Sequence, residues 1–244
     1  MTPRDVGATV GIVGGLGPES TIDYYRRILE TWERGNTVAA PGIVIDSLDV
    51  RTALHLVASD RPALIEYLLA SLRRLAGAGV DFAAISANTP HIVFDDLAAR
   101  SPVPLVSIVE TCAEEARRRG LRRLAILGTR FTMQATFYAD VFARRDMAVM
   151  PPSDGDITWV HERYVGELLE GQFREETRQE FIALVSRMCN AERIDGVVLG
   201  GTELPLLLST SDIAGVPVLD TTALHVAAIV TRLRLAPSLQ AEAS

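Results

Sequence analysis

Short runs of apolar residues, most of them rich in valine and isoleucine, alternate with segments of helical pattern along the chain. The runs lie at residues 8–13, 42–46, 80–86, 103–106, 123–127, 146–150, 195–199 and 216–219. Several carry apolar residues at successive positions, which is typical of strands buried on both faces of a parallel sheet. The pattern therefore predicts an α/β protein whose mostly parallel sheets are flanked by helices.

One of the helical segments has clear start and stop signals. Asp60-Arg61-Pro62 places a capping residue before an early proline. An apolar stripe and then a glycine, Gly77, follow. The stripe consists of Leu64, Leu68, Leu72 and Leu75. These residues predict an amphipathic helix between two of the strands.

A weak internal repeat predicts two similar lobes. A strand followed by glycine ends at Gly14 and again at Gly128, and further strand ends lie at Ala87 and Gly201. Both intervals are 73 residues long (87 − 14 and 201 − 128). We assign residues 1–105 plus 207–244 to the first lobe and 106–206 to the second, so that the C-terminal strand and helix rejoin the first lobe. Because open α/β sheets bind ligands at the carboxyl ends of their strands, the predicted active site is a cleft between the lobes.

The charge balance excludes several kinds of partner. The chain has 24 Lys and Arg against 31 Asp and Glu, a formal charge of −7, so neither nucleic acid nor an anionic membrane is an expected partner. No apolar run approaches the ~20 residues of a membrane span. The first residues, Met1-Thr2-Pro3-Arg4-Asp5, lack the features of a signal peptide. The chain has two cysteines, too few for a disulfide framework. A cytoplasmic location is expected.

A glycine-rich segment follows the first predicted strand. It reads Gly14-Gly15-Leu16-Gly17-Pro18-Glu19-Ser20-Thr21 and precedes a predicted helix. Glycines allow a ligand to approach the backbone closely, and a helix N-terminus offers N–H groups to an anion. A dinucleotide-binding fingerprint would require glycine in place of Ser20. A small carboxylate is therefore the better-matched ligand, and a tight turn without any ligand is the alternative.

Polar loops follow four more predicted strands. They contain Asn88-Thr89, Thr129 with Thr132, Thr202-Glu203, and Asp220-Thr221-Thr222. Their amide and hydroxyl groups are donors suited to the carboxylate of an amino acid. Each loop alone could be a capped turn, but their recurrence at successive strand ends indicates one shared site.

Four segments together resemble the aspartate/glutamate racemase superfamily over essentially the whole chain. They are Gly14–Thr21, Asn88-Thr89-Pro90-His91, Thr202-Glu203-Leu204 and Asp220-Thr221-Thr222. The resemblance implies two similar lobes with the active site between them, a homodimer, and chemistry without pyridoxal phosphate, metal or other cofactor. That chemistry takes place at the α-carbon of an acidic amino acid or a similar small carboxylate. The expected substrate-binding residues are Gly15, Glu19, Arg51, Asn88, Thr89, Thr129, Thr132, Thr202 and Thr221.

The chain departs from this superfamily at two positions. Such racemases carry a cysteine just before the Asn-Thr pair and another just before the Thr-Glu pair, where this chain has Ala87 and Gly201. Neither residue can remove or deliver a proton. Cys112 and Cys189 lie on apolar faces of predicted helices and are interpreted as small apolar residues.

Two other residues are the predicted acid–base groups. His91 and Glu203 each lie two to four residues beyond a vacant cysteine position, and burial can shift the pKa of either side chain toward neutrality. In the alternative interpretation, His91 packs against the helix that begins at Pro90, and Glu203 orders the loop at Thr202. The four histidines do not have a metal-ligand spacing.

Three classes of function remain open at this stage. The first is an isomerase of the racemase or epimerase type. The second is an enzyme of the same fold with altered chemistry (a lyase, a decarboxylase or a cyclising isomerase) that uses groups other than thiols. The third is a protein that binds a small carboxylate without turning it over.

Overall fold

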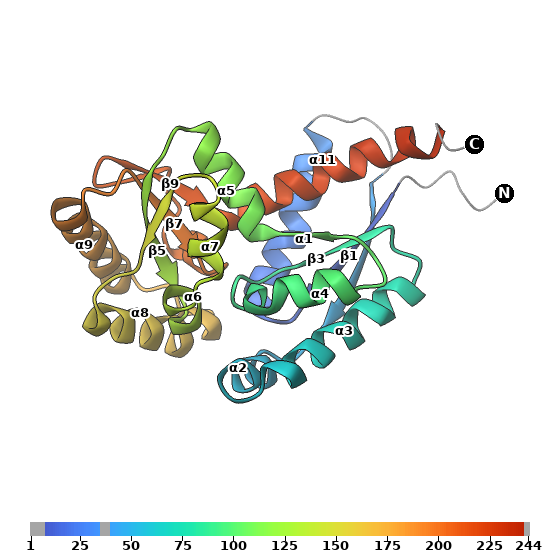
Figure 1. Cartoon of the computed structure of the whole chain (residues 1–244), viewed down its shortest axis with the longest axis horizontal. Helices are drawn as coiled ribbons and strands as arrows, with labels where there is room; N and C mark the ends of the chain where they lie inside the picture. The colour runs from blue at the N-terminus through green and yellow to red at the C-terminus, as the bar shows by residue number, and fades with distance from the viewer. Residues whose placement is uncertain (1–7, 35–39, 242–244) are drawn as a thin grey trace. The chain divides into compact units, whose positions relative to one another are not determined.

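The computed structural model describes residues 8–34 and 40–241 and divides the chain into two compact units (Figure 1). Unit 1 contains Met1–Ser86, Val93–Ser107 and His225–Ser244, and unit 2 contains Ala87–Ile92 and Ile108–Leu224. The segment inspected for a signal peptide, residues 1–5, lies outside the described residues.

Unit 1 is built on a parallel sheet of four strands in the order β2-β1-β3-β4. Val10 of β1 pairs with Ile43 of β2 on one side and with Phe82 of β3 on the other. The strands are β1 (Thr9–Gly14), β2 (Gly42–Ser47), β3 (Phe82–Ile85) and β4 (Leu105–Val106). The helices are α1 (Pro18–Glu33), α2 (Val50–Ser59), α3 (Arg61–Gly77), α4 (Phe94–Arg100) and the greater part of α11 (Thr221–Ala241).

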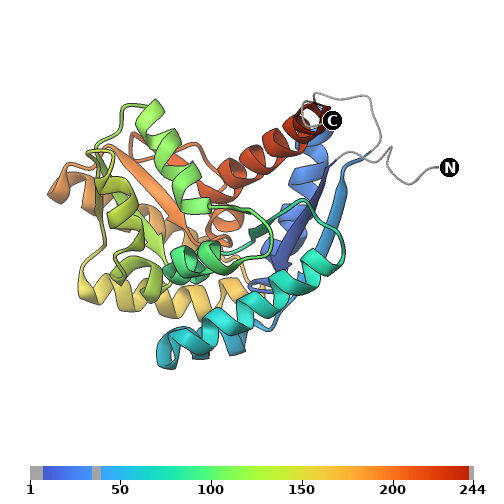
Figure 2. The same ribbon diagram turned by 45° about the vertical axis from the view of Figure 1, so that its right-hand side comes forward.

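Helices cover both faces of this sheet (Figure 2). On one face, α1 and α11 pack against Val10, Ile12 and Phe82 in a buried cluster. On the other, α3 lies against the strands, and Leu75 is so close to the backbone of Gly11 that an added Cβ there would lie 3.1 Å from its Cδ1. The predicted leucine stripe of α3 is fully buried, and Asp60 accepts a hydrogen bond of 3.0 Å from the N–H of Ala63 at the start of the helix.

Unit 2 is built on a five-stranded sheet in the order β6-β5-β7-β9-β8, of which β8 alone is antiparallel to its neighbour. The strands are β5 (Arg123–Gly128), β6 (Ala148–Met150), β7 (Gly196–Gly200), β8 (Asp212–Ile213) and β9 (Val216–Asp220). The helical segments are η1 (Thr89–Val93), α5 (Ile108–Arg118), α6 (Arg130–Gln134), α7 (Phe137–Ala143), α8 (Asp154–Gly166), η2 (Leu168–Glu170), α9 (Glu175–Glu192) and α10 (Leu204–Leu207).

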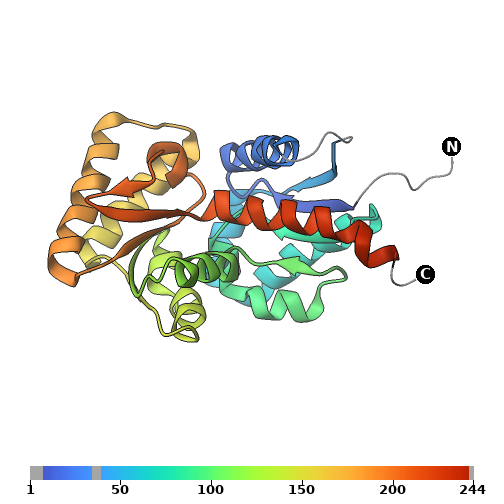
Figure 3. The same cartoon turned by 90° about the horizontal axis from the view of Figure 1, so that it is seen from above.

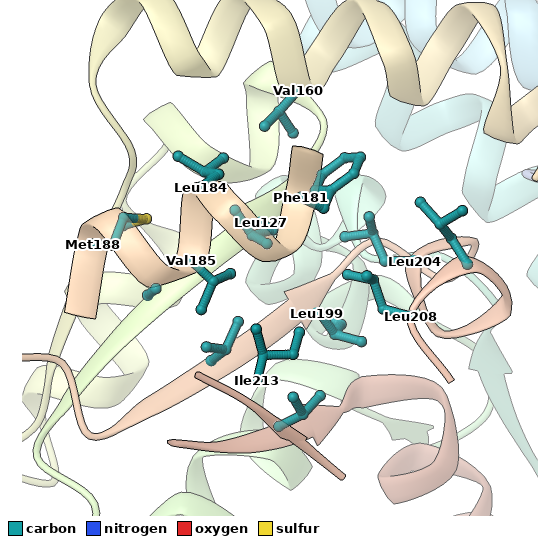
Figure 4. Close-up of a cluster of buried hydrophobic side chains, with 14 of the residues drawn as sticks. Leu127, Val160, Phe181, Leu184, Val185, Met188, Leu199, Leu204, Leu208 and Ile213 are labelled. Carbon is teal, nitrogen blue, oxygen red and sulfur yellow. The ribbon is translucent and has the colours of Figure 1, made fainter. Parts of the chain in front are cut away.

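Alternate residues of the strands in unit 2 enter two separate cores. Leu127, Leu199 and Val218 face α8, α9 and α10, whereas Ile126, Val198 and Leu219 face α5 and α7. Figure 3 shows α8 and α9 on one side of the sheet and α5 and α7 on the other. Figure 4 shows the first core, in which side chains of α9 interdigitate with those of β7 and α10. Burial on both faces explains why these strands are apolar at successive positions.

The predicted α/β class and its two mostly parallel sheets are confirmed, and each of the eight predicted strands is present. The lobe boundary differs from the prediction. Residues 207–224 belong to unit 2, because β9 pairs with β7 through Val197 and Val218 and so extends that sheet. The chain passes between the units at residues 107/108 and again at 224/225, rather than near residue 206. Of the chain after residue 107, only α11, from His225 onward, returns to unit 1.

The two units exchange helices as a result. α5 follows β4 of unit 1 and packs in unit 2, whereas most of α11 follows β9 of unit 2 and packs in unit 1. A short segment after β3, Ala87–Ile92, also belongs to unit 2. Two of the predicted site residues, Asn88 and Thr89, are thereby placed in unit 2.

Candidate functional site

Seven of the predicted site residues lie together in unit 2 as buried polar side chains. They follow the carboxyl ends of β5, β7 and β9 or lie in the segment Ala87–Ile92. These residues are Asn88, Thr89, Thr129, Thr132, Thr202, Glu203 and Thr221. Hydrogen bonds join them into three groups.

The first group consists of three threonine hydroxyls. The Thr89 Oγ1 lies 2.9 Å from that of Thr129 and 3.2 Å from that of Thr132, and the latter two are 3.2 Å apart. Thr129 also caps α6, since its hydroxyl accepts a hydrogen bond of 3.3 Å from the N–H of Thr132. Three hydroxyl groups that meet in a buried position supply both donors and acceptors to a polar ligand.

The second group orients the amide of Asn88. Its Oδ1 accepts a hydrogen bond of 2.5 Å from the hydroxyl of Tyr138, and its Nδ2 donates one of 3.1 Å to Thr221. The Thr221 hydroxyl in turn donates to the carbonyl oxygen of Leu199 at 2.7 Å. Because the Thr221 hydroxyl donates its only proton to this carbonyl oxygen, it must accept the hydrogen bond from the Asn88 amide. This requirement fixes the orientation of the Asn88 side chain.

The third group surrounds the carboxyl group of Glu203. The hydroxyl of Tyr164 donates a hydrogen bond to its Oε2, and the hydroxyl of Thr202 donates another at 3.2 Å. Glu203 is only 1% exposed. Burial, together with the charge of the neighbouring carboxylate, raises the pKa of Tyr164 well above its usual value. The phenol therefore stays protonated and acts as a donor at neutral pH.

His91 has no nitrogen directed at a ligand. Its Nδ1 lies 3.0 Å from the carbonyl oxygen of Ala87, and its Nε2 accepts a hydrogen bond of 3.3 Å from the N–H of Ile108. A carbonyl oxygen can only accept, so Nδ1 carries the proton and the imidazole is held in one neutral tautomer. This arrangement matches the packing alternative, and a role of His91 as an acid or base stays a prediction.

The remaining predicted residues belong to unit 1. Gly15 has a φ of 75°, and a Cβ at this position would lie 2.0 Å from the carbonyl oxygen of Leu48, so only glycine fits the turn. Its N–H donates to the hydroxyl of Thr21 at 2.9 Å, which ties the glycine-rich segment to the first turn of α1. Glu19 and Arg51 are exposed. The contacts of Gly15 match the alternative of a tight turn, and a binding role for Glu19 and Arg51 stays a prediction.

His225 lies in the core of unit 1. Its Nε2 donates to the carbonyl oxygen of Val106 at 3.0 Å, so its Nδ1 accepts from the hydroxyl of Tyr24 at 2.9 Å. Burial lowers the pKa of His225 to about 4. The imidazole is therefore neutral in the folded protein at pH 7.

We expect this burial to weaken the protein in acid. An unfolded histidine binds a proton below pH ~6.5, and the folded one does so only near pH 4, so the stability falls as the pH drops through this window. The total loss attributable to His225 is about 3 kcal/mol by pH 4. Urea unfolding at several pH values measures it. His225→Gln is expected to flatten the curve of unfolding free energy against pH between pH 6.5 and 4. His55→Gln alters an exposed side chain and is expected to leave this curve unchanged. Equal slopes in the wild type and both variants would contradict this account.

Both cysteines are embedded in or packed on the cores of unit 2. Cys112 is fully buried beside Val109 and Ala113, and burial raises the pKa of its thiol. Cys189 is half-buried against the other core, and burial raises the pKa of its thiol as well. Neither cysteine therefore has the lowered pKa of a reactive thiol.

Within residues 8–34 and 40–241, no His, Cys, Asp and Glu side chains gather in a group of three that could hold a metal ion. In the same part of the chain, no helix is both long and apolar enough to cross a membrane.

Sequence reasoning missed two tyrosines of the site. Tyr138 of α7 binds Asn88, and Tyr164 of α8 binds Glu203. Both are nearly fully buried aromatic residues on helices, where the sequence pattern indicates ordinary core positions. A buried tyrosine normally needs a hydrogen-bond partner for its hydroxyl. This need was the one signal in the sequence that indicated a role for Tyr138 and Tyr164 beyond packing.

The structure is that of an α/β protein with buried polar groups at the strand ends of unit 2, the edge at which such sheets commonly bind ligands. The Asp/Glu/hydantoin racemase family matches residues 13–229, and the protein belongs to this family.

Individual relatives agree with this assignment. The structure of PH1733, an aspartate racemase homologue from Pyrococcus horikoshii OT3, is 30% identical and superposes with a TM-score of 0.78 over 93% of this chain and 99% of that one. Glutamate racemase from Aquifex pyrophilus is 19% identical, with a TM-score of 0.63 over 91% and 83% of the two chains, and shows the shared fold. The broad specificity amino-acid racemase RacX of Bacillus subtilis (strain 168) is 26% identical over 140 residues. That match covers 54% of this chain and 59% of RacX.

Proposed function

We propose that the protein is an amino-acid isomerase that moves a proton at the α-carbon of an acidic amino acid or a similar small carboxylate, without a cofactor. The observation that carries the proposal is the buried carboxyl group of Glu203 and the two hydroxyls that bind it, within a unit of the racemase fold. A carboxyl group in such a position can exchange a proton with a bound substrate. Glu203 is therefore the proposed acid–base group.

The other polar groups of unit 2 suit the binding of such a substrate. The hydroxyls of Thr89, Thr129 and Thr132 and the amide of Asn88 can donate hydrogen bonds to a carboxylate. All are fixed by their neighbours, so little conformational entropy is lost when a ligand binds. We place Thr202 and Thr221 in the same binding role.

We further propose that Ala87 and Gly201 stand where thiols act in other members of the family. Neither side chain holds a titratable proton, and the chemistry then depends on groups such as Glu203. A single acid–base group favours protonation of one face, as in a lyase or decarboxylase, over inversion. Positions 87 and 201 carry no titratable group, whereas Glu203 carries one. A lyase or decarboxylase activity is therefore worth testing beside the isomerase activity.

The test is incubation of the purified protein in D₂O with L- and D-amino acids, aspartate and glutamate first. Chiral chromatography and mass spectrometry follow the α-carbon. Deuterium at the α-carbon with inversion supports an isomerase, whereas a product of different mass supports the lyase or decarboxylase. If no amino acid exchanges or reacts, while one raises the melting temperature, the protein binds a small carboxylate without turnover and the proposed activity is wrong.

The resemblance implies a homodimer, and unit 1 offers a surface on which to test it. Ile22 and Tyr25, three residues apart on α1, are each 45% exposed, and Ile45 of β2 is 39% exposed. Neighbouring large apolar side chains that are exposed, such as Ile22 and Tyr25, are typical of an interface. Sedimentation velocity is expected to give a dimer for the wild type and a monomer for Ile22→Asp/Tyr25→Asp. A wild-type monomer, or a dimer that survives both changes, would contradict this expectation.

A further inference from the structure

Tyr164 reaches the end of β7 because the residue there is glycine. A Cβ at Gly201 would lie 2.3 Å from Cε2 of Tyr164 and 2.8 Å from its hydroxyl oxygen, far inside normal contact distance. The aromatic ring thus occupies the space that a side chain at position 201 would need. No other residue at this position would admit the ring without displacing it.

The position of the ring is fixed by helix α8, of which Tyr164 is a part. Ile157, Val160 and Tyr164 lie three and four residues apart on one face of α8 and are all buried in the same core. The body of the ring packs among apolar side chains, while the hydroxyl is directed at Glu203 and donates to its Oε2. The phenol therefore has a fixed position between the strand end and the carboxyl group.

We propose that Tyr164 is a catalytic residue that relays a proton between the α-carbon of the substrate and Glu203. This inference rests on the proposed function. In the relay, the C–H bond at the α-carbon breaks and its proton forms a new O–H bond on the phenol oxygen. The original phenol proton passes at the same time to Oε2 of Glu203, and the electron pair of the broken C–H bond stays on the substrate. The reverse step returns a proton to carbon.

The surroundings of the phenol favour a relay over a simple base. Burial disfavours a tyrosinate, and the neighbouring carboxylate adds a second negative charge; both effects raise the pKa of Tyr164. When the phenol gains one proton as it loses another, no tyrosinate accumulates. The Glu203 carboxylate becomes a carboxylic acid, and the net charge of the pair rises by one.

The experiment measures α-deuterium exchange in D₂O for the amino acid that the wild type exchanges fastest. Tyr164→Phe, which removes only the hydroxyl, is expected to lower the exchange rate at least 100-fold while the variant stays folded and still gains thermal stability from that amino acid. Tyr24→Phe is the matched control, because it removes a buried tyrosine hydroxyl from the core of unit 1. It is expected to exchange at the wild-type rate below its melting temperature.

Two further variants separate a relay from a structural role. Tyr164→Phe/Glu203→Gln is expected to be no slower than the slower single variant, since the two residues act on one proton. Gly201→Ala keeps both groups and displaces the ring, so it is expected to lose a similar factor even if Tyr164→Phe fails to fold.

The outcomes also separate this inference from the function on which it depends. If the wild type exchanges no amino acid, the proposed function and the relay are both overturned. If the wild type exchanges but Tyr164→Phe remains within threefold of it, or if the losses of the two single variants multiply, only the relay is overturned.

Discussion

Replacement of Glu203 by glutamine is expected to lower the α-deuterium exchange rate by about 10²- to 10⁴-fold, the usual contribution of a positioned acid or base. Glutamine keeps the shape of the side chain and an oxygen that can accept from Tyr164 and Thr202. It cannot take up or release a proton. The loss should therefore appear in the exchange rate while the fold is maintained.

Glu167 provides a matched control in the same unit. It is also buried, accepts a hydrogen bond of 2.6 Å from Thr177 and forms an ion pair of 2.6 Å with Arg163. Glu167→Gln is expected to reduce the melting temperature, because it leaves the guanidinium without its charged partner, and to retain exchange below that temperature. Equal exchange rates in Glu203→Gln and the wild type would remove Glu203 from the mechanism.

Replacement of Phe181 by alanine is expected to cost about 3–5 kcal/mol of unfolding free energy. Phe181 of α9 is fully buried in the core shown in Figure 4, and its ring lies 4.9 Å from that of Trp159 between centroids. The change removes the ring and leaves a cavity that rigid neighbours from α8, α9 and β7 can fill only in part.

Urea unfolding followed by circular dichroism measures this cost. Phe173→Ala deletes the same atoms from a side chain that is 38% exposed and is expected to change the free energy of unfolding by less than about 1 kcal/mol. A loss in Phe181→Ala no larger than in Phe173→Ala would mean that the cluster does not stabilise unit 2.

β1, β3, β5 and β7 were predictable because they are buried on both faces. After their first residues, Arg123 and Asp195, the runs 123–127 and 195–199 contain no polar residue, and the structure places their alternate side chains in two different cores. The lobe boundary was not predictable in the same way. The run 216–219 marks a strand, but its partner β7 is set by long-range packing that the local pattern does not encode.

The site was predictable only where its residues follow strands. Thr89, Thr129 and Thr202 stand just beyond strand ends, where polar residues have little reason to be buried unless they bind something. Tyr138 and Tyr164 come from helices and reach the same groups over 50 and 39 residues of sequence. The surroundings of His91 were not predictable either: both ring nitrogens contact backbone groups, which no spacing of residue types reveals.

The exchange of helices between the units has a consequence for biosynthesis. The core of unit 1 needs Val226, Ile229, Val230 and Leu233, which leave the ribosome only after every strand of unit 2 has been made. Until then, the face of β1 and β3 that carries Val10, Ile12 and Phe82 lacks much of its cover. The sheet of unit 1 is thus the first to be synthesised and the last to be completed, and its apolar face stays partly uncovered in the nascent chain until α11 is made.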